Sequence, residues 1–306
     1  MRHRPHLLFV VAALAFGTAF VGIKAGVATL PPVLFAAFRF DLGAALLLSA
    51  LLLRQGVAGS LPRTRHDLLG VGVAGVFLVT INGVLLFVGQ QFTTSAAAAV
   101  VYGVVPLATA PFAALVLRER LSLVGTLGLV VGFAGLVVVV QPSPALLRGT
   151  GVGEALVVVA AFSVAFGSVL LRRLHPTLSS FALTAWAMAV GAVCSHALSL
   201  VLGEPLAVTW TPSAVVAVVW LGTVSTGLAF PAYFALIREA GPVRANLVAY
   251  VVPIVAAVSG AVVLGESVSP TTVVGFLVVL CGFALLEREA LRRDLRAALN
   301  RVRTAE

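Results

Sequence analysis

Two stretches of 36 residues decide the fold of this chain. The first is Val100–Gly135, VVYGVVPLATAPFAALVLRERLSLVGTLGLVVGFAG, and the second is Leu247–Gly282, LVAYVVPIVAAVSGAVVLGESVSPTTVVGFLVVLCG, which lies 147 residues further along. Thirteen of the 36 aligned positions are identical. Each stretch contains an apolar segment, a short polar corner with a glutamate and a second apolar segment. This pattern is typical of two consecutive membrane-spanning helices.

The aligned residues of rarer types are the stronger evidence for an internal repeat, because Val, Ala, Leu and Gly are abundant enough in this chain to match by chance. Pro106 aligns with Pro253, and Glu119 aligns with Glu266. Extending the same offset over the whole chain gives five apolar segments in each half. Two copies of an odd number of spans must face the membrane in opposite directions. The sequence therefore predicts an all-α membrane protein of ten transmembrane helices, built as two inverted five-helix repeats.

The composition agrees with a membrane environment. Of the 306 residues, 60% are hydrophobic and 10% are charged, with a mean hydropathy of +1.12. Soluble domains are about 45–50% apolar and about 25% charged, so an ordinary soluble enzyme, a disordered chain and a fibrous protein are excluded. The ten expected spans are residues 7–28, 33–53, 68–90, 93–117, 121–140, 152–171, 180–202, 213–236, 242–263 and 270–286.

The sequence contains no catalytic, metal-binding or nucleotide-binding motif. The single lysine, Lys24, follows Ile23 and not a glycine, which excludes a phosphate-binding loop and therefore an ATP-hydrolysing subunit. The two cysteines, Cys194 and Cys281, lie in apolar runs and are typical of packing residues. We therefore expect no enzyme activity, no cofactor and no metal site.

The basic residues predict the topology. If the N-terminus is cytoplasmic, 17 of the 20 Lys and Arg residues lie on the inner side, only Arg148 lies outside, and Lys24 and Arg39 lie within spans. The net charge of +9 then labels the inner face of the membrane and does not indicate nucleic-acid binding. Both termini are expected in the cytoplasm, in a multi-pass protein of the inner (plasma) membrane.

This organisation divides the chain into a first repeat at residues 1–145, a second repeat at 150–287 and a basic tail at 288–306. The tail is predicted to lie as an amphipathic helix on the anionic inner leaflet, or to be a solvated charged segment. Inverted repeats are the architecture of secondary transporters, whose substrate site lies at the repeat interface near the midplane. A duplicated membrane protein of another kind is the alternative.

Several short motifs resemble a known family. They are FGTAFVGIK at 16–24, with Phe where the signature usually has Trp, PP at 31–32, FRF at 38–40, and the corners LRER at 117–120 and LGE at 264–266. Together they resemble the EamA family of the drug/metabolite transporter superfamily. The resemblance implies transport of small metabolites without ATP, with export of amino acids or related compounds as the first expectation. A passive facilitator or channel for small polar or aromatic solutes is the alternative, and an intramembrane enzyme is disfavoured.

Polar residues inside apolar spans are the expected substrate-binding groups. Asn246 and Tyr250 share one face of the ninth span because they are four residues apart, and an amide beside a phenol suits a zwitterion or a polar aromatic solute. Spans three, four, seven and eight contribute further polar or aromatic groups. The predicted substrate-binding residues are Asn82, Tyr102, Trp186, Tyr233, Asn246 and Tyr250. Hydrogen bonding between helices is the alternative role for these side chains.

Four residues are candidates for gating. Pro106 and Pro253 interrupt the backbone hydrogen bonds of the fourth and ninth spans and form either hinges or static bends. Lys24 and Arg39 fall in the outer half of the membrane, where each is either an outer gate or a counter-charge for a substrate carboxylate. Alternatively, both side chains reach the interface or cap neighbouring helix ends.

His196 and Asp41 are the candidates for proton coupling, because His titrates near neutrality and both residues lie within spans. A hydrogen bond from His196 to a backbone carbonyl is the alternative. The small four-span relatives exchange protons through a Glu in the first span, which this chain lacks. Glu119 and Glu266 are expected to cap the helices that follow them. The oligomeric state stays open, since the glycines of residues 125–135 would pack either within one chain or between copies.

Overall fold

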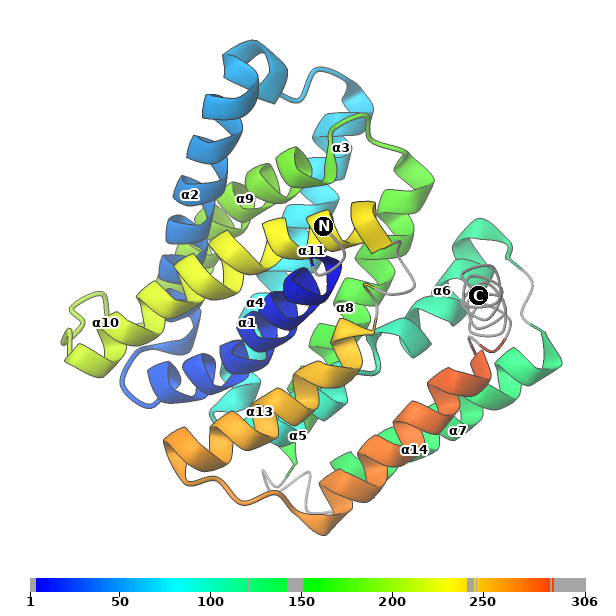
Figure 1. Cartoon of the computed structure of the whole chain (residues 1–306). Coiled ribbons are helices and arrows are strands. Elements are labelled where there is room, and N and C mark those ends of the chain that lie inside the picture. The colour runs from blue at the N-terminus through cyan, green and yellow to red at the C-terminus, as the bar shows by residue number, and fades with distance from the viewer. Residues whose placement is uncertain are drawn as a thin grey trace.

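The protein is a bundle of apolar helices (Figure 1). A computed structural model describes residues 4–119, 122–141, 151–240, 245, 247–286 and 288. Eight helical segments in this part of the chain are long and apolar enough to cross a membrane, and two further apolar helices, Val248–Leu264 and Pro270–Leu286, are shorter. The predicted all-helical membrane protein is therefore confirmed. Both Arg148 and the predicted amphipathic tail lie outside the described residues, apart from position 288.

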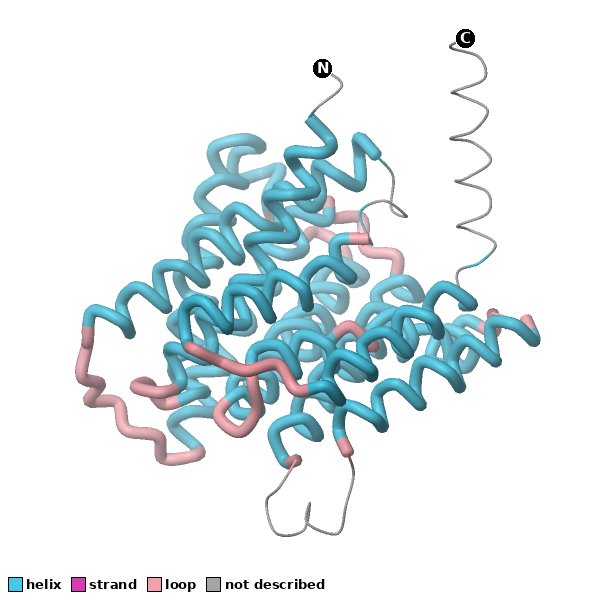
Figure 2. The backbone as a smooth tube through the Cα atoms, turned by 60° about the horizontal axis from the view of Figure 1, so that its bottom comes forward, coloured by secondary structure: helices cyan, strands magenta, loops and turns pink. Residues whose placement is uncertain are grey.

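Each of the ten predicted spans corresponds to one helical segment, and several segments are composite. The described elements are α1 (Arg4–Val27), α2 (Pro32–Ser60), α3 (Arg65–Val73), η1 (Ala74–Ile81), α4 (Asn82–Gln90), α5 (Ser95–Tyr102), α6 (Val105–Leu117), α7 (Leu123–Val140), α8 (Val152–Leu174), α9 (Ser180–Val201), α10 (Pro212–Val219), η3 (Trp220–Leu228), α11 (Ala229–Ala240), α13 (Val248–Leu264) and α14 (Pro270–Leu286). The longest connection within the described residues, 202–211, lies between α9 and α10 (Figure 2).

Hydroxyl side chains set where several helices begin. Thr94, Ser122, Ser179 and Thr211 each accept a hydrogen bond from a backbone N–H in the first turn of α5, α7, α9 and α10. Such caps satisfy donors that have no partner inside the helix and stabilise it by about 1 kcal/mol. At the start of α7, for example, the Ser122 Oγ lies 3.0 Å from the Gly125 nitrogen.

The third and eighth spans share an unusual backbone feature. Each contains a π-helical segment, η1 in the third and η3 in the eighth. In each segment a threonine hydroxyl donates to the carbonyl five residues earlier, Thr80 to Gly75 at 2.8 Å and Thr226 to Leu221 at 2.9 Å. The wider turn leaves a carbonyl that a side chain can satisfy, and π segments are frequent at functional sites.

The fourth and ninth spans differ although their prolines align. The fourth span breaks after α5 at Gly103 and Val104, and Pro106 stands in the first turn of α6. Proline fits there because the first N–H groups of a helix have no intrahelical acceptor. The ninth span continues as the single helix α13 through Pro253. Only the first of the two aligned prolines therefore coincides with a break in its helix.

Helices from the two halves of the chain pack against each other in pairs. α7 runs alongside α14 at one edge of the bundle, as Figure 1 shows, and α2 packs against α9. α1 packs against α13 and α11, while α8 packs against α6 and α4. α8 is the sixth span and α1 is the first, so the contacts of α8 with the fourth and third spans repeat those of α1 with the ninth and eighth spans. Gly128 and Gly135 of α7 lie against the backbone of α14 in the same chain, and a Cβ at Gly132 would meet Leu107 of α6.

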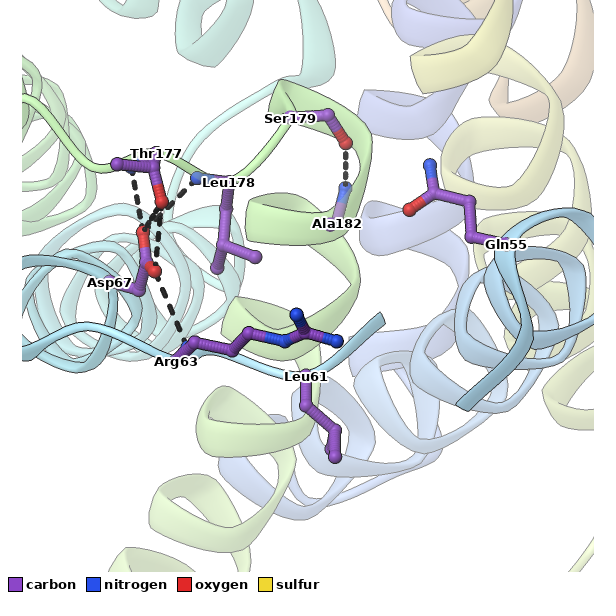
Figure 3. A pocket seen from close by; sticks show the side chains of 8 residues that line it. All are labelled: Gln55, Leu61, Arg63, Asp67, Thr177, Leu178, Ser179 and Ala182. Carbon is purple, nitrogen blue, oxygen red and sulfur yellow. Dashed lines mark hydrogen bonds between the residues drawn. The ribbon is translucent and has the colours of Figure 1, made fainter. Parts of the chain in front are cut away.

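Two carboxylates join the halves crosswise. Asp67, at the start of α3, accepts from the backbone nitrogens of Thr177 at 2.7 Å and Leu178 at 3.1 Å, just before α9 (Figure 3). Glu204, which follows α9, accepts from the nitrogens of Val33 at 3.0 Å and Leu34 at 2.8 Å in the first turn of α2. Each carboxylate therefore fixes the beginning of a helix in the other half, where free N–H groups favour negative charge.

Candidate functional site

A row of aromatic rings crosses the centre of the bundle on α1. Phe16 packs edge-on against Phe230 and Tyr233 of α11, with ring centroids 5.4 and 6.0 Å apart. One turn further along α1, Phe20 packs edge-on against Tyr102 of α5 at 6.0 Å. We call Tyr233, Phe16, Phe20 and Tyr102 the aromatic row. It links two of the predicted substrate-binding tyrosines, one from each half of the chain, through side chains of the first span.

At the Tyr102 end of the row lies a positively charged cluster. The Arg39 guanidinium lies 5.6 Å from the ring centroids of both Phe40 and Phe87. It is close enough to Tyr102 for electrostatic interaction, and Asn82 lies beside the Tyr102 hydroxyl. We call Arg39, Asn82, Phe87 and Tyr102 the Arg39 cluster. Spans two, three and four therefore bring together one predicted gating residue and two predicted substrate-binding residues.

The sequence explains how these side chains meet. Arg39 is seven residues from the start of α2, which places it about 10 Å along the helix. Tyr102 ends α5, directly before the break in the fourth span. Asn82 is the first residue after η1, and its Nδ2 donates to the Leu78 carbonyl at 3.1 Å. The π segment and the helix break thus place polar side chains from the interior of two spans near the same arginine.

Polar contacts join several spans at the end of the bundle near Lys24. The Lys24 ammonium donates to the carbonyls of Gln90 at 2.8 Å and Gln91 at 3.3 Å. Ser95, at the start of α5, donates its backbone N–H to the Glu266 carboxylate at 3.0 Å. Thr93 donates to Glu154 of α8. Lys24 therefore caps the C-terminus of α4, as in the second of its two predicted roles.

Charged side chains also join spans at the opposite end. Arg172 forms an ion pair with Glu119, and Arg173 donates to the Val116 carbonyl at 2.8 Å. The expectation that Glu119 and Glu266 cap the helices that follow them is wrong. Glu266 instead accepts from Ser95, which begins a helix of the other half, because the corner after α13 lies against that helix start.

His196 and Asp41, predicted separately, form a pair. His196 Nε2 lies 2.7 Å from Asp41 Oδ2, which joins α9 to α2. Their side chains are 38% and 49% exposed. Phe38 packs edge-on against the His196 ring at 5.8 Å, and Trp210 packs against Phe38. An imidazole–carboxylate pair beside aromatic rings is able to bind and release a proton.

Two further predicted substrate-binding residues, Tyr250 and Trp186, lie on α13 and α9. The Tyr250 ring packs against Phe283 of α14, with centroids 4.6 Å apart. Trp186 is half-buried on α9, which packs against α2 and η1. Asn246 lies outside the described residues. The prediction of one amide–phenol stripe on the ninth span is therefore only partly described, and its tyrosine faces a helix of its own half.

Sequence reasoning missed Phe16, Phe20 and Phe87 as parts of the site. The signal was present in the spacing, since Phe16 and Phe20 are four residues apart and share one face of α1. Eighteen phenylalanines in the chain gave no way to separate these rings from lipid-facing ones.

Arg39, Asn82 and Tyr102 are each half-buried. One hollow of about 300 Å³ lies around Asp67, and another of about 420 Å³ lies between α2, α9 and α11. Neither is lined by Arg39, Asn82 or Tyr102.

A multi-pass helical membrane protein with polar groups enclosed between its halves has the design of a transport protein. The chain belongs to the EamA-like transporter family, whose model matches twice, over residues 3–141 and 151–288. Membership indicates a membrane transporter, a class that does not normally act as an enzyme.

Several relatives span most of the chain. An uncharacterized transporter of Archaeoglobus fulgidus is 27% identical over 92% of this chain and 99% of its own length. The uncharacterized inner membrane transporter YedA of Escherichia coli K12 is 34% identical, covering 84% of this chain and 81% of its own. A solved crystal structure has the same fold, with a TM-score of 0.64 and 24% identity over 94% of this chain and 98% of the other.

Proposed function

We propose that the protein is a secondary transporter of the inner membrane that moves small metabolites, with export of amino acids or related compounds as its activity. The observation that carries the proposal is the convergence of polar and aromatic groups from both halves on α1. Tyr102, with Arg39 and Asn82 near it, forms one end of the row, and Tyr233 forms the other. Residues shared by both halves are where alternating access places a substrate.

The packing supports two inverted repeats at residues 1–145 and 150–287. Ser225 of the eighth span donates to the Ala15 carbonyl of the first at 2.9 Å. Ser163 of the sixth span donates to the Phe77 carbonyl of the third at 2.8 Å. These bonds occupy matching places in the two halves, with donor and acceptor exchanged. The basic helix ends near Arg172 and Arg4 support cytoplasmic termini.

The aromatic row provides the first test. Replacing Tyr102 or Tyr233 by Ala is expected to lower the transport rate at least about tenfold, equal to about 1.4 kcal/mol, because each ring closes one end of the row. Counterflow of labelled amino acids in proteoliposomes measures this. Phe92→Ala is the control, since its ring is 61% exposed. Wild-type rates in both tyrosine variants would contradict the assignment. Uptake that never saturates, without counterflow, would favour a passive facilitator instead.

The His196–Asp41 pair provides the second test. We propose that it carries protons during transport, which is supported by its geometry. The variant His196→Gln is expected to lose acceleration by an imposed pH gradient while keeping counterflow, because solute exchange needs no net proton movement. His175→Gln is the matched control, since the His175 ring has its one hydrogen bond among the described residues with the nearby Arg173 carbonyl. Wild-type transport that ignores the gradient would contradict proton coupling.

A further inference from the structure

Arg39 carries a positive charge into the bundle without a counter-ion in the described part of the chain. Its Nε is buried without a hydrogen-bond partner. The seven carboxylates that the structure describes are all engaged elsewhere: Asp41 by His196, Asp67 by Thr177, Glu119 by Arg172, Glu154 by Thr93, Glu204 by Val33, Glu239 by Arg4 and Glu266 by Ser95.

An enclosed cation of this kind needs a compensating group. The rings of Phe40 and Phe87 contact the guanidinium and offset part of the cost of removing it from water. Rings cannot use the five N–H donors of a guanidinium, which are arranged to bind a carboxylate with two parallel hydrogen bonds. The chemistry at Arg39 therefore suits an anionic group that the described part of the chain does not supply.

An acceptor near Tyr102 also lacks a partner. Asn82 Oδ1 is buried without a hydrogen bond. Its orientation follows from the other end of the amide, because Nδ2 donates to the Leu78 carbonyl at 3.1 Å. Tyr102 lies near both Arg39 and Asn82. A free donor group and a free acceptor oxygen around one tyrosine match the two charges of a zwitterion.

We propose that Arg39 binds the carboxylate of the transported solute and that Asn82 Oδ1 accepts a hydrogen bond from its α-ammonium group. The substrates are therefore α-amino acids with apolar or aromatic side chains, which the rings of Phe20, Phe87 and Tyr102 contact. This inference rests on the proposed transport function and names its substrate class. Lys24, by contrast, already donates hydrogen bonds to the carbonyls of Gln90 and Gln91.

Two matched sets of solutes separate the charges. The first is L-phenylalanine, 3-phenylpropionate and phenethylamine, and the second is L-leucine, 4-methylpentanoate and 3-methylbutylamine. Each set holds the complete zwitterion, the carboxylate alone and the amine alone. Binding to the purified full-length protein is followed by the shift of its melting temperature. We expect at least one set in which the zwitterion binds best, the carboxylate binds more weakly and the amine does not bind.

The variants assign the two contacts. Arg39→Gln is expected to weaken binding of the zwitterion and of the carboxylate at least about tenfold, and Arg39→Lys to keep part of it. Asn82→Leu is expected to weaken only the zwitterion. Arg54→Gln is the matched control, because Arg54 also lies over a ring, that of Phe181, at 5.7 Å. If Arg39 only stabilised the fold, its replacement would lower the melting temperature of the ligand-free protein. Because we propose that Arg39 is an uncompensated binding group, the melting temperature of ligand-free Arg39→Gln should equal or exceed that of wild type.

Several results would overturn the proposal. In the binding experiments, these results are an amine that binds as tightly as the matching carboxylate, no binding of any carboxylate, or wild-type affinity in Arg39→Gln. In the absence of ligand, the result is a melting temperature of Arg39→Gln below that of wild type. Counterflow tests the proposed transport function separately from the proposed substrate contacts. If carboxylates bind but no solute shows counterflow, the substrate contacts stand and the proposed function falls. Saturable counterflow of amines alone would leave the proposed function and remove Arg39 as a carboxylate site.

Discussion

Replacing Gly282 by Leu is expected to abolish the folded protein. A Cβ at this position would lie 2.5 Å from the Gly132 Cα and 2.7 Å from the Gly128 carbonyl oxygen. These atoms belong to the backbone of α7, which cannot turn aside as a flexible side chain can. Overpacking a core usually costs about 1–3 kcal/mol, and here the whole α7–α14 seam must separate. Yield of monodisperse protein and its melting temperature measure the effect.

A second glycine serves as the control. It separates the effect of a clash between α7 and α14 from the effect of replacing a glycine in any helix. Gly72 lies in α3, and a Cβ there would meet no atom within 4 Å. Gly72→Leu should therefore leave the yield and melting temperature near those of wild type. Even Gly282→Ala should lower the melting temperature, since the added methyl occupies the same short gap. A Gly282→Leu protein that purifies and melts like wild type would contradict the role of the seam.

The fold was largely predictable because lipid constrains a chain so strongly. Backbone groups in a bilayer must be satisfied within each segment, so apolar runs of sufficient length become helices. Residues 123–140 illustrate this, since α7 falls within the predicted span. The same rule says nothing about irregular turns inside a span. The π segments around Thr80 and Thr226 and the break at Gly103 depend on side-chain bonds and packing that hydropathy does not record.

Several residues of the candidate site were predictable from the sequence, but which of them lie close together was not. Tyr102, Asn82 and Tyr233 stood out because polar groups in apolar spans are rare. Their joining through α1 depends on packing between helices far apart in the sequence. Arg39 and Asp41 illustrate the limit, because they are two residues apart and serve different clusters. Helical periodicity separates their faces, but only the bundle sets which neighbours those faces meet.

Asp67→Leu is expected to lower the stability of the protein by about 3 kcal/mol or more, because one buried carboxylate holds two segments together. Asp67 is only 1% exposed. It accepts from the nitrogens of Thr177, Leu178 and Thr64 and from the Thr177 hydroxyl. Hydrogen bonds to a charged group are worth about 1.5–3 kcal/mol each, and their loss would leave buried N–H groups without acceptors. The melting temperature in detergent measures the effect.

The surrounding residues make the cause of that loss testable. Thr64→Ala removes one cap of α3 while the carboxylate stays, so its cost should be near 1 kcal/mol. Glu204→Gln, at the reciprocal contact, should cost less than Asp67→Leu because Glu204 is only half-buried and Gln keeps one of the two oxygens that accept from Val33 and Leu34. Asp67→Asn also keeps one acceptor, but it turns an NH₂ group toward backbone donors, so its melting temperature should fall between those of Asp67→Leu and wild type. If Asp67→Leu cost no more than Thr64→Ala, the carboxylate would serve only its own helix, and α3 would owe its position beside α9 to apolar packing alone.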